Sequence, residues 1–164
     1  MNANARPSLW TPNLDTLDSL DVDDLVLGVF SDVRPLPGVA GLVDWRMCGT
    51  LSRFVREGRL GGAQGERVLI PGAGRVGARR VFLFGLGPRE HYARRITELA
   101  AEIPQVVRQA GSRRAVLALP GPSRVIGPAM ERMVGELGGV LLAIFDHDGK
   151  LGDWVEGSQP AGGA

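Results

Sequence analysis

Continuous apolar runs of strand length, separated by segments with helical periodicity, constrain the fold of this chain most strongly. Residues 25–30 read Leu-Val-Leu-Gly-Val-Phe, and comparable runs occupy residues 67–70, 81–84, 115–119 and 140–145. A strand that is apolar at every position is typical of a sheet that is covered on both faces. The runs therefore predict a buried sheet with helices on either side.

Three segments between these runs place apolar residues at three- or four-residue spacing, as one face of a helix requires. They cover residues 39–55, 92–110 and 126–137. No such segment separates the runs at 67–70 and 81–84, so the sheet should be mixed. The fold class predicted is α/β, a three-layer α/β/α sandwich with a mixed sheet.

The length of 164 residues and the apolar content of 44% suit one domain. Both ends are poor in apolar residues, so we expect residues 1–12 to be a flexible segment and residues 156–164 to be a disordered tail. A single domain should then occupy residues 13–155. Within it, residues 146–149 predict a turn into a short final strand that ends near Trp154.

The single cysteine, Cys48, excludes an internal disulfide and any metal cage made only of cysteines. It falls within the helical pattern of residues 39–55, where we expect it to pack in the core. The amino terminus lacks the apolar region of a signal peptide, and no apolar run approaches the roughly twenty residues needed to span a bilayer. We expect a soluble cytoplasmic protein without a membrane partner.

Positive charge is concentrated in the middle of the chain, although the formal net charge is only +1. Residues 33–114 hold fifteen arginines against six acidic side chains. This segment forms either solvated helix surface or a face that binds an anion or a partner. Nucleic-acid binding ranks last, because the net charge is near zero and aromatic residues do not interleave the arginines. The arginines that would carry it are Arg53, Arg56, Arg59, Arg79, Arg80, Arg94 and Arg95.

Residues 72–77 match the pattern G-x-G-x-x-G directly after a predicted strand. A dinucleotide site requires a helix to begin within this motif, so that free N–H groups and the helix dipole meet the pyrophosphate. Residues 78–80 instead lead straight into the strand at 81–84. The motif therefore predicts a glycine-rich hairpin connection.

Two other glycine turns join a strand to a helix and could hold an anion. The first contains Gly38 and Gly41, and the second contains Gly85 and Gly87 and is followed by Arg89. Free backbone N–H groups at a helix start, together with an arginine, favour a phosphate or a carboxylate. Close packing of strand against helix requires glycine at the same positions. Both interpretations stay open.

The sequence offers no metal site, cofactor site or catalytic residue. Residues 146–150 begin like a calcium loop, but Lys150 stands where a third oxygen ligand is required, and no glutamate follows in register. The two histidines, His91 and His147, are far apart in sequence and lie in polar surroundings. No nucleophile and base can be paired from spacing alone.

The order of elements over residues 24–90 closely resembles the non-catalytic amino-terminal domain of leucyl aminopeptidases. The resemblance rests on Asp-Leu-Val-Leu-Gly-Val-Phe-Ser-Asp at 24–32, on Leu-Pro-Gly-Val-Ala-Gly at 36–41, on the segment 54–71, and on the strand and Gly-Leu-Gly-Pro-Arg-Glu turn at 80–90. It covers roughly residues 14–120. It implies a macrodomain-like fold, with a mixed sheet between helical layers.

The resemblance implies no catalytic residue for this chain. The metal ligands and the catalytic arginine of the family lie in the following domain, whose marker Asn-Thr-Asp-Ala-Glu-Gly-Arg-Leu is absent from these 164 residues. We therefore expect no enzyme activity. Macrodomains present glycines to a nucleotide diphosphate near residues 36–41, after an asparagine-bearing loop. Here residues 30–34 read Phe-Ser-Asp-Val-Arg, which weighs against ADP-ribose binding.

The leading hypothesis is a stand-alone interaction, assembly or regulatory domain that acts through a protein partner or through self-association. Leu9, Trp10 and Trp154 are the apolar side chains expected to be exposed for such contact, because aromatic residues are enriched at binding hot spots. Their alternative role is to cap the core. The second hypothesis is a degenerate macrodomain-like pocket that binds a nucleotide or another small anion between Gly38–Gly41 and Gly85–Arg89.

Overall fold

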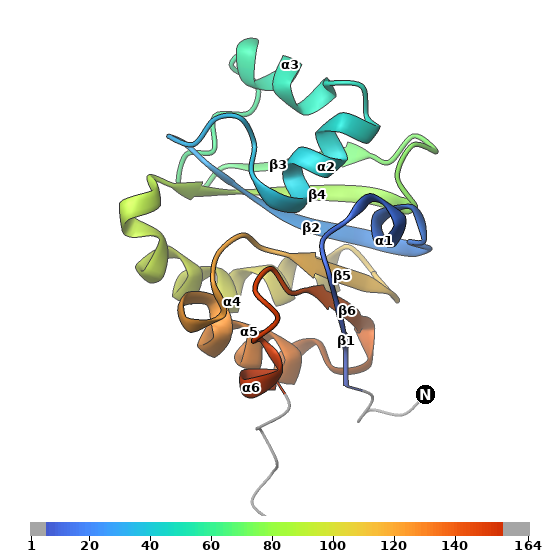
Figure 1. The fold of residues 1–164 in the computed structure, drawn as a ribbon, viewed down its shortest axis with the longest axis vertical. Helices are drawn as coiled ribbons and strands as arrows, with labels where there is room; N and C mark the ends of the chain where they lie inside the picture. Colours follow the sequence, from blue (N-terminus) through green and yellow to red (C-terminus); the bar gives the residue numbers. More distant parts are fainter. Residues whose placement is uncertain (1–5, 156–164) are drawn as a thin grey trace, which may run out of the picture.

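A computed structural model describes residues 6–155, which form one six-stranded sheet with the order β1-β6-β5-β2-β4-β3 (Figure 1). Neighbouring strands are parallel, except that β3 runs antiparallel to β4. The mixed sheet predicted from the sequence is thus confirmed. The strands are β1 Ser8–Trp10, β2 Val22–Phe30, β3 Arg67–Pro71, β4 Ala78–Gly87, β5 Ala115–Ala118 and β6 Leu141–Phe145.

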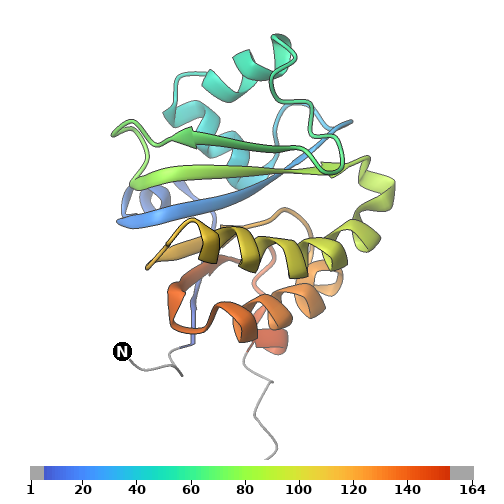
Figure 2. The ribbon, with the colours of Figure 1, turned by 180° about the vertical axis from the view of Figure 1, so that it is seen from behind.

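Helices cover both faces of the sheet, which confirms the three-layer α/β/α prediction (Figures 1 and 2). The helices α1, α2 and α3 pack on one face, and α4, α5 and α6 pack on the other. The α-helices are α1 Leu14–Asp18, α2 Gly38–Arg46, α3 Thr50–Arg56, α4 Tyr92–Gln109, α5 Ser123–Leu137 and α6 Gly152–Val155; short 3-10 turns are η1 Arg89–His91 and η2 Gly138–Val140. Within the described residues, no helix is both long and apolar enough to cross a bilayer.

The strand β2 shows why the sequence is apolar at successive positions. Val26 and Phe30 enter the core beneath α4 and α5, whereas Leu25, Leu27 and Val29 enter the core beneath α1 to α3. Successive side chains of a strand point to opposite faces, so a strand covered on both sides needs apolar residues throughout. The expectation of a strand buried on both faces is confirmed.

The amino-terminal prediction is wrong for the part of it that the structure describes. Residues 1–12 were expected to be flexible, but Ser8–Trp10 pair in parallel with β6, and Ser8 lies opposite Ala143. These residues carry no apolar run, so their order comes from pairing with the edge of an existing sheet rather than from local pattern. Residues 1–5 and the predicted tail at 156–164 lie outside the described residues.

The helix predicted over residues 39–55 is two helices. The helix α2 ends at Arg46 and α3 begins at Thr50, while Cys48 and Gly49 between them have φ of 54° and 75°. Such left-handed backbone cannot continue a right-handed helix. Cys48 is exposed at this break, so its predicted core position is wrong. The apolar spacing runs across the break because three residues pack in the same core: Val43, Met47 and Leu51.

The predicted final strand is a helix. The carboxylate of buried Asp146 accepts hydrogen bonds from the backbone N–H groups of Asp148, Gly149 and Leu151, at 3.3, 2.9 and 3.1 Å. These bonds turn the chain and lead it into α6. The side chain of Leu151 is fully buried beneath α5, so the last element packs on a helix rather than on the sheet.

The glycine-rich segment at 72–77 connects β3 and β4, as predicted. The N–H of Gly72 donates to the carbonyl of Arg79 at 3.0 Å, which begins the antiparallel pairing. A Cβ added at Gly77 would lie 1.8 Å from the carbonyl oxygen of Leu20. The glycines therefore allow close backbone packing, and no helix begins within the motif.

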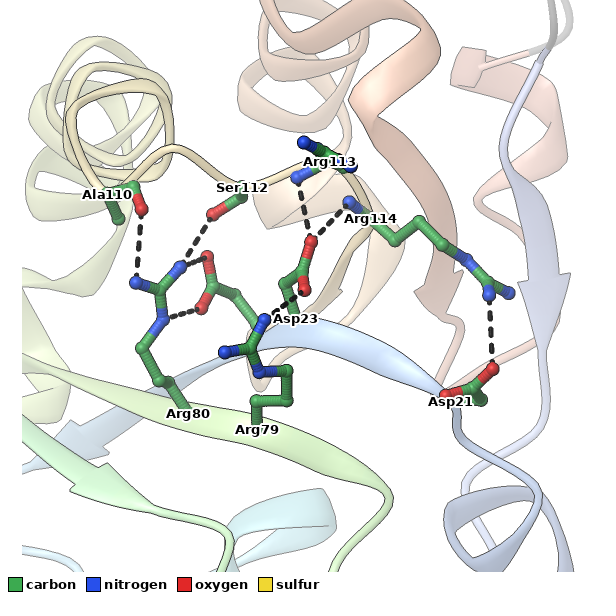
Figure 3. Close-up of polar contacts among 9 residues, drawn as sticks. Asp21, Asp23, Arg79, Arg80, Ala110, Ser112, Arg113 and Arg114 are labelled. Atoms are coloured by element: carbon green, nitrogen blue, oxygen red, sulfur yellow. Dashed lines mark hydrogen bonds and ion pairs between the residues drawn. The ribbon is translucent and has the colours of Figure 1, made fainter.

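An ion pair with a buried carboxylate joins β2 to β4 at the amino end of β2 (Figure 3). The fully buried Asp24 accepts two hydrogen bonds from the Arg80 guanidinium, at 2.6 and 3.0 Å. Arg80 also donates to the carbonyl of Ala110 at 3.0 Å and to the Ser112 hydroxyl at 3.4 Å. Burial raises the pKa of the Asp24 carboxyl, and Arg80 opposes that rise. The cluster ties the central strands to the loop before β5.

Candidate functional site

A cavity of about 550 Å³ opens at the carboxyl ends of four parallel strands, β2, β4, β5 and β6. The loops that follow parallel strands meet at one edge of the sheet, which is where open α/β proteins commonly bind ligands. Fifteen residues line it: Phe30, Val33, Pro37, Gly38, Arg89, Glu90, Tyr92, Ala93, Pro120, Gly121, Pro122, Arg124, Val125, His147 and Asp148. We call this the carboxyl-edge pocket.

Two exposed arginines line the carboxyl-edge pocket, together with the carboxylates of Glu90 and Asp148. Arg89 follows β4, and Arg124 lies in the first turn of α5. Within residues 6–155, neither guanidinium forms an ion pair or a hydrogen bond. Unpaired guanidinium groups at the rim of a pocket favour carboxylate or phosphate groups, which they can hold in a bidentate manner.

Of the two acidic residues that line the pocket, Asp148 is already engaged in the wall, and Glu90 lies 3.4 Å from the His91 Nε2 atom. Its carboxylate accepts hydrogen bonds from both the hydroxyl and the backbone N–H of Ser123, the latter at 2.9 Å. These hydrogen bonds hold the pKa of the Asp148 carboxyl below its usual value. Asp148 thus caps the first turn of α5, and the N–H of Ser123 is not free for a ligand. The side chains left to bind an anion are the arginines.

His147 forms the wall of the pocket beside Gly38, which has a φ of +58°. A Cβ added at Gly38 would lie 2.8 Å from the Cε1 atom of His147, so only glycine fits there. The His147 Nε2 atom is buried and has no hydrogen-bond partner among residues 6–155. Desolvation lowers the pKa of His147, and the nearby Asp146 and Asp148 carboxylates oppose that shift.

The interior of the pocket is aromatic. The rings of Phe30 and Tyr92 meet edge to face, with their centroids 4.9 Å apart. The Tyr92 hydroxyl donates to the carbonyl of Pro120 at 2.5 Å, and burial raises the pKa of Tyr92, which keeps the phenol neutral. The pocket therefore combines an apolar floor with a rim that carries two unpaired arginines and the Glu90 carboxylate. The arginines suit a ligand with one flat or apolar part and one anionic part.

The structure brings only two of the five predicted anion-site residues into this pocket, Gly38 and Arg89. Gly41 lies beside a separate groove. Gly85 and Gly87 pack against the loop before β3. The five were predicted to share one site, and the structure does not bring them together.

Packing explains the two glycines at the end of β4. A Cβ on Gly85 would lie 1.8 Å from the carbonyl oxygen of Ala63. The N–H of Gly87 donates to the carbonyl of Gly62 at 2.9 Å. The backbone N–H of Arg89, which was expected to be free for an anion, donates to the Asp32 carboxylate at 3.0 Å. The close-packing interpretation of this turn fits the structure.

The second groove, of about 440 Å³, lies beside the exposed Trp45 of α2. The Trp45 side chain is 64% exposed, and the Arg46 guanidinium lies 4.9 Å from its ring centroid. Arg46 is held there by an ion pair with Asp18 of α1. The groove is lined by Pro35, Leu36, Gly41, Asp44, Trp45, Cys48 and Gly49. We call it the Trp45 groove.

The three predicted contact residues do not form one surface. Leu9, Trp10 and Trp154 are each half-buried. Leu9 packs against the core beneath α4 to α6, whereas Trp10 packs against the core beneath α1 to α3. The ring of Trp154 lies over Gly127 of α5, where an added Cβ would come within 2.4 Å of the indole. Core capping, the alternative role, describes these side chains better.

The arginines proposed for nucleic-acid binding are partly engaged inside the domain. Arg95 is buried and pairs with Glu98 and Glu102 at 3.0 and 3.1 Å. Arg80 is bound to the buried Asp24. These arginines are therefore not part of an exposed basic face. Within residues 6–155, no group of three or more His, Cys, Asp or Glu side chains is placed to hold a metal ion.

Arg124, His147 and Trp45 were not among the site residues predicted from the sequence. Arg124 follows the run at 115–119 and His147 follows the run at 140–145, so the rule that ligands bind at the carboxyl ends of parallel strands could have selected both. Trp45 lies off the apolar stripe of its helix, and a large aromatic residue on the polar side predicts exposure. The sequence thus contained a reason to select each residue. Only the fold shows that Arg124 and His147 line the same pocket.

The fold of this chain is macrodomain-like. Its structure is similar to the macrodomain of Mycobacterium tuberculosis DarG, with a TM-score of 0.60 and 14% identity over 85% of this chain and 98% of the other. A macrodomain from Oceanobacillus iheyensis, solved with ADPR, has a TM-score of 0.54 and 13% identity over 95% and 92% of the chains. A tomato leucine aminopeptidase variant has a TM-score of 0.63 and 13% identity over 95% of this chain and 36% of its own.

Residues 26–134 match the N-terminal domain of the cytosol aminopeptidase family, and the chain belongs to this family. A probable cytosol aminopeptidase of Alkaliphilus metalliredigens is 26% identical over 122 residues, which are 74% of this chain and 24% of the relative. That of Burkholderia multivorans is 36% identical over 70 residues, or 43% and 14%. The chain thus spans about a quarter or less of the length of these relatives. The resemblance stated from the sequence is confirmed.

Proposed function

We propose that this chain is a non-catalytic binding domain that acts through contact with a protein partner. The observation that carries the proposal is Trp45, which keeps 64% of its side chain exposed beside a groove. Tryptophan and arginine are enriched at binding hot spots, and Arg46 already orders the Trp45 ring from one side. The family match supports it, because the match covers the N-terminal domain only.

Replacing Trp45 with alanine is expected to abolish capture of the partner and to leave the fold intact. The exposed ring contributes little to the core, so the free energy of unfolding should change by less than about 1 kcal/mol. The measurement compares proteins recovered from a native lysate by tagged wild type and by Trp45→Ala, with an Arg132→Ala variant as the control from the opposite face. A partner retained equally by Trp45→Ala would overturn the proposal.

A second candidate function is the binding of a small anionic ligand in the carboxyl-edge pocket. It is favoured by the two unpaired guanidinium groups of Arg89 and Arg124 above an aromatic floor. A macrodomain of this fold was solved with ADPR, which has a diphosphate and an aromatic base. Residues 30–34 lack the asparagine-bearing loop of macrodomains, which weighs against ADP-ribose itself. The test therefore includes other nucleotides and simpler phosphates.

Calorimetry with ADP-ribose, mononucleotides and inorganic phosphate tests this second function. If a ligand binds, Arg124→Ala should weaken its affinity at least tenfold, which corresponds to about 1.4 kcal/mol for a lost charge-assisted contact. Arg132→Ala is the matched control, because Arg132 lies on the same helix and pairs with Glu136 at 2.9 Å. The absence of heat at millimolar ligand would exclude the pocket as a site for these anions.

A further inference from the structure

The strand β3 is the outermost strand on one side of the sheet (Figure 1). An edge strand pairs on one side only, so half of its backbone groups point away from β4. The N–H of Gly85 donates to the carbonyl of Glu66 at 2.8 Å, and residues facing each other across β3 and β4 alternate between bonded and non-bonded pairs. By this alternation Val68 and Ile70 bond to β4. The backbone groups of Arg67, Leu69 and Pro71 therefore face outward.

These three residues are exposed, and the central one is apolar. Leu69 is 52% exposed; together with Trp45 it is one of two large apolar side chains left exposed within residues 6–155. Edge strands commonly carry a charge at such a position, because a charge blocks pairing with another chain. The flanking charge of Arg67 is neutralised by Glu102 of α4 at 2.6 Å. The middle of the β3 edge thus lacks a free charge that would block pairing with another chain.

We infer that β3 pairs with β3 of a second copy of this chain, antiparallel and about a two-fold axis at Leu69. In this register each Leu69 N–H donates to the Leu69 carbonyl of the other copy. Each Arg67 N–H donates to the carbonyl of Pro71 opposite. Every outward-facing donor of the strand then has an acceptor, and the two Leu69 side chains cover one another.

Proline explains why the pairing stops. Pro71 has no N–H, so it can accept from the second copy but cannot donate to it. An unrelated extended peptide could use the same backbone groups, but it would not supply the matching leucine that a two-fold axis brings. A register shifted to an axis at Val68 would place Leu69 opposite Arg67, whose guanidinium is already bound by Glu102. The apolar pair favours the axis at Leu69.

The interface is small, so the dimer should be weak, with a dissociation constant on the order of 100 µM. Sedimentation of the wild type over rising concentration is expected to show a species near twice the 17.5 kDa of one chain. The Leu69→Lys variant should raise the dissociation constant at least tenfold, because two like charges would face each other. A monomer at every concentration up to about 1 mM, or a dimer unchanged by Leu69→Lys, would overturn the inference.

Cross-linking tests the register in a Cys48→Ser background. Leu69→Cys should form a disulfide between copies, because bonded antiparallel pairs bring Cα atoms to about 5.5 Å, within disulfide range. Arg67→Cys should not cross-link to itself. Disulfides only in mixtures of Leu69→Cys and Arg67→Cys chains would overturn the axis at Leu69. The inference does not depend on the Trp45 partner: Trp45→Ala should still dimerise, and Leu69→Lys should still capture the partner.

Discussion

Replacing Arg80 with methionine is expected to lower the free energy of unfolding by about 3 kcal/mol, because it leaves the buried Asp24 carboxylate without its bidentate partner. Asp24 is fully buried, and Arg80 contacts it at 2.6 and 3.0 Å while also bonding to the loop before β5. Methionine keeps most of the side-chain volume, so the loss reports the charge and its hydrogen bonds. Urea unfolding of both proteins measures it.

The matched control for Arg80→Met is Arg79→Met. Arg79 is the preceding residue on β4, its side chain is 83% exposed, and it reaches Asp23 only at 3.4 Å. An exposed pair of this kind contributes little, so we expect a loss below about 0.5 kcal/mol. Equal losses of unfolding free energy in the two variants would show that the Asp24–Arg80 pair stabilises the sheet no more than an exposed pair does.

The loss caused by Arg80→Met should also depend on pH. Burial raises the folded-state pKa of Asp24 above 3.8, and removing Arg80 raises it further. An acid with a raised folded-state pKa loses stability as pH rises above the unfolded value, because ionisation is easier in the unfolded chain. The deficit of the variant should therefore be smaller at about pH 4.5 than at about pH 7.5. A deficit that shrinks as pH rises would contradict this assignment.

Replacing Gly85 with alanine is expected to destabilise the domain by about 3 kcal/mol, because the new methyl group has no room. A Cβ at this position would lie 1.8 Å from the carbonyl oxygen of Ala63, a backbone atom that cannot move without shifting the loop before β3. The thermal midpoint and the urea midpoint should both fall. Anion binding in the carboxyl-edge pocket should be unaffected in the fraction that stays folded, since Gly85 does not line it.

Gly135→Ala is the control for the Gly85 substitution. Gly135 lies within α5, and apart from its chain neighbours and the backbone of its own helix, no heavy atom lies within 4 Å of a Cβ added there. Alanine in a helix interior should stabilise the domain by about 0.5–1 kcal/mol, because it reduces the entropy lost on folding. If Gly85→Ala kept full stability but removed anion binding, Gly85 would be a ligand-binding residue and the packing argument would be wrong.

Most helices and strands were predictable, because the spacing of apolar residues along the chain shows which faces of each element are buried. Residues 25–30 are apolar at each position since β2 is covered on both faces, and the stripe at 92–110 follows one face of α4. The pair at 67–70 and 81–84 lacked a helix between its members and is antiparallel. These signals need no knowledge of distant residues, because the period alone reports which faces are covered.

The errors fall where order depends on a distant partner. Ser8–Trp10 form a strand only because β6 offers an open edge. The break at Cys48 and Gly49 is invisible to periodicity, since residues on both sides of it enter one core. The final strand was predicted from a turn pattern, yet the Asp146 carboxylate and the contact with α5 make it a helix.

The residues by themselves determined a covered mixed sheet, the glycine hairpin and the family, because periodicity, turn chemistry and residue order are local properties of a chain. Only the tertiary structure decided which glycines line a cavity and which merely allow close packing. It gathered Arg89, Arg124 and His147 from the segments that follow β4, β5 and β6, and it left Leu69 exposed at the edge of the sheet. Strand order and non-local packing bring the pocket residues together, and no spacing along the chain encodes that proximity directly.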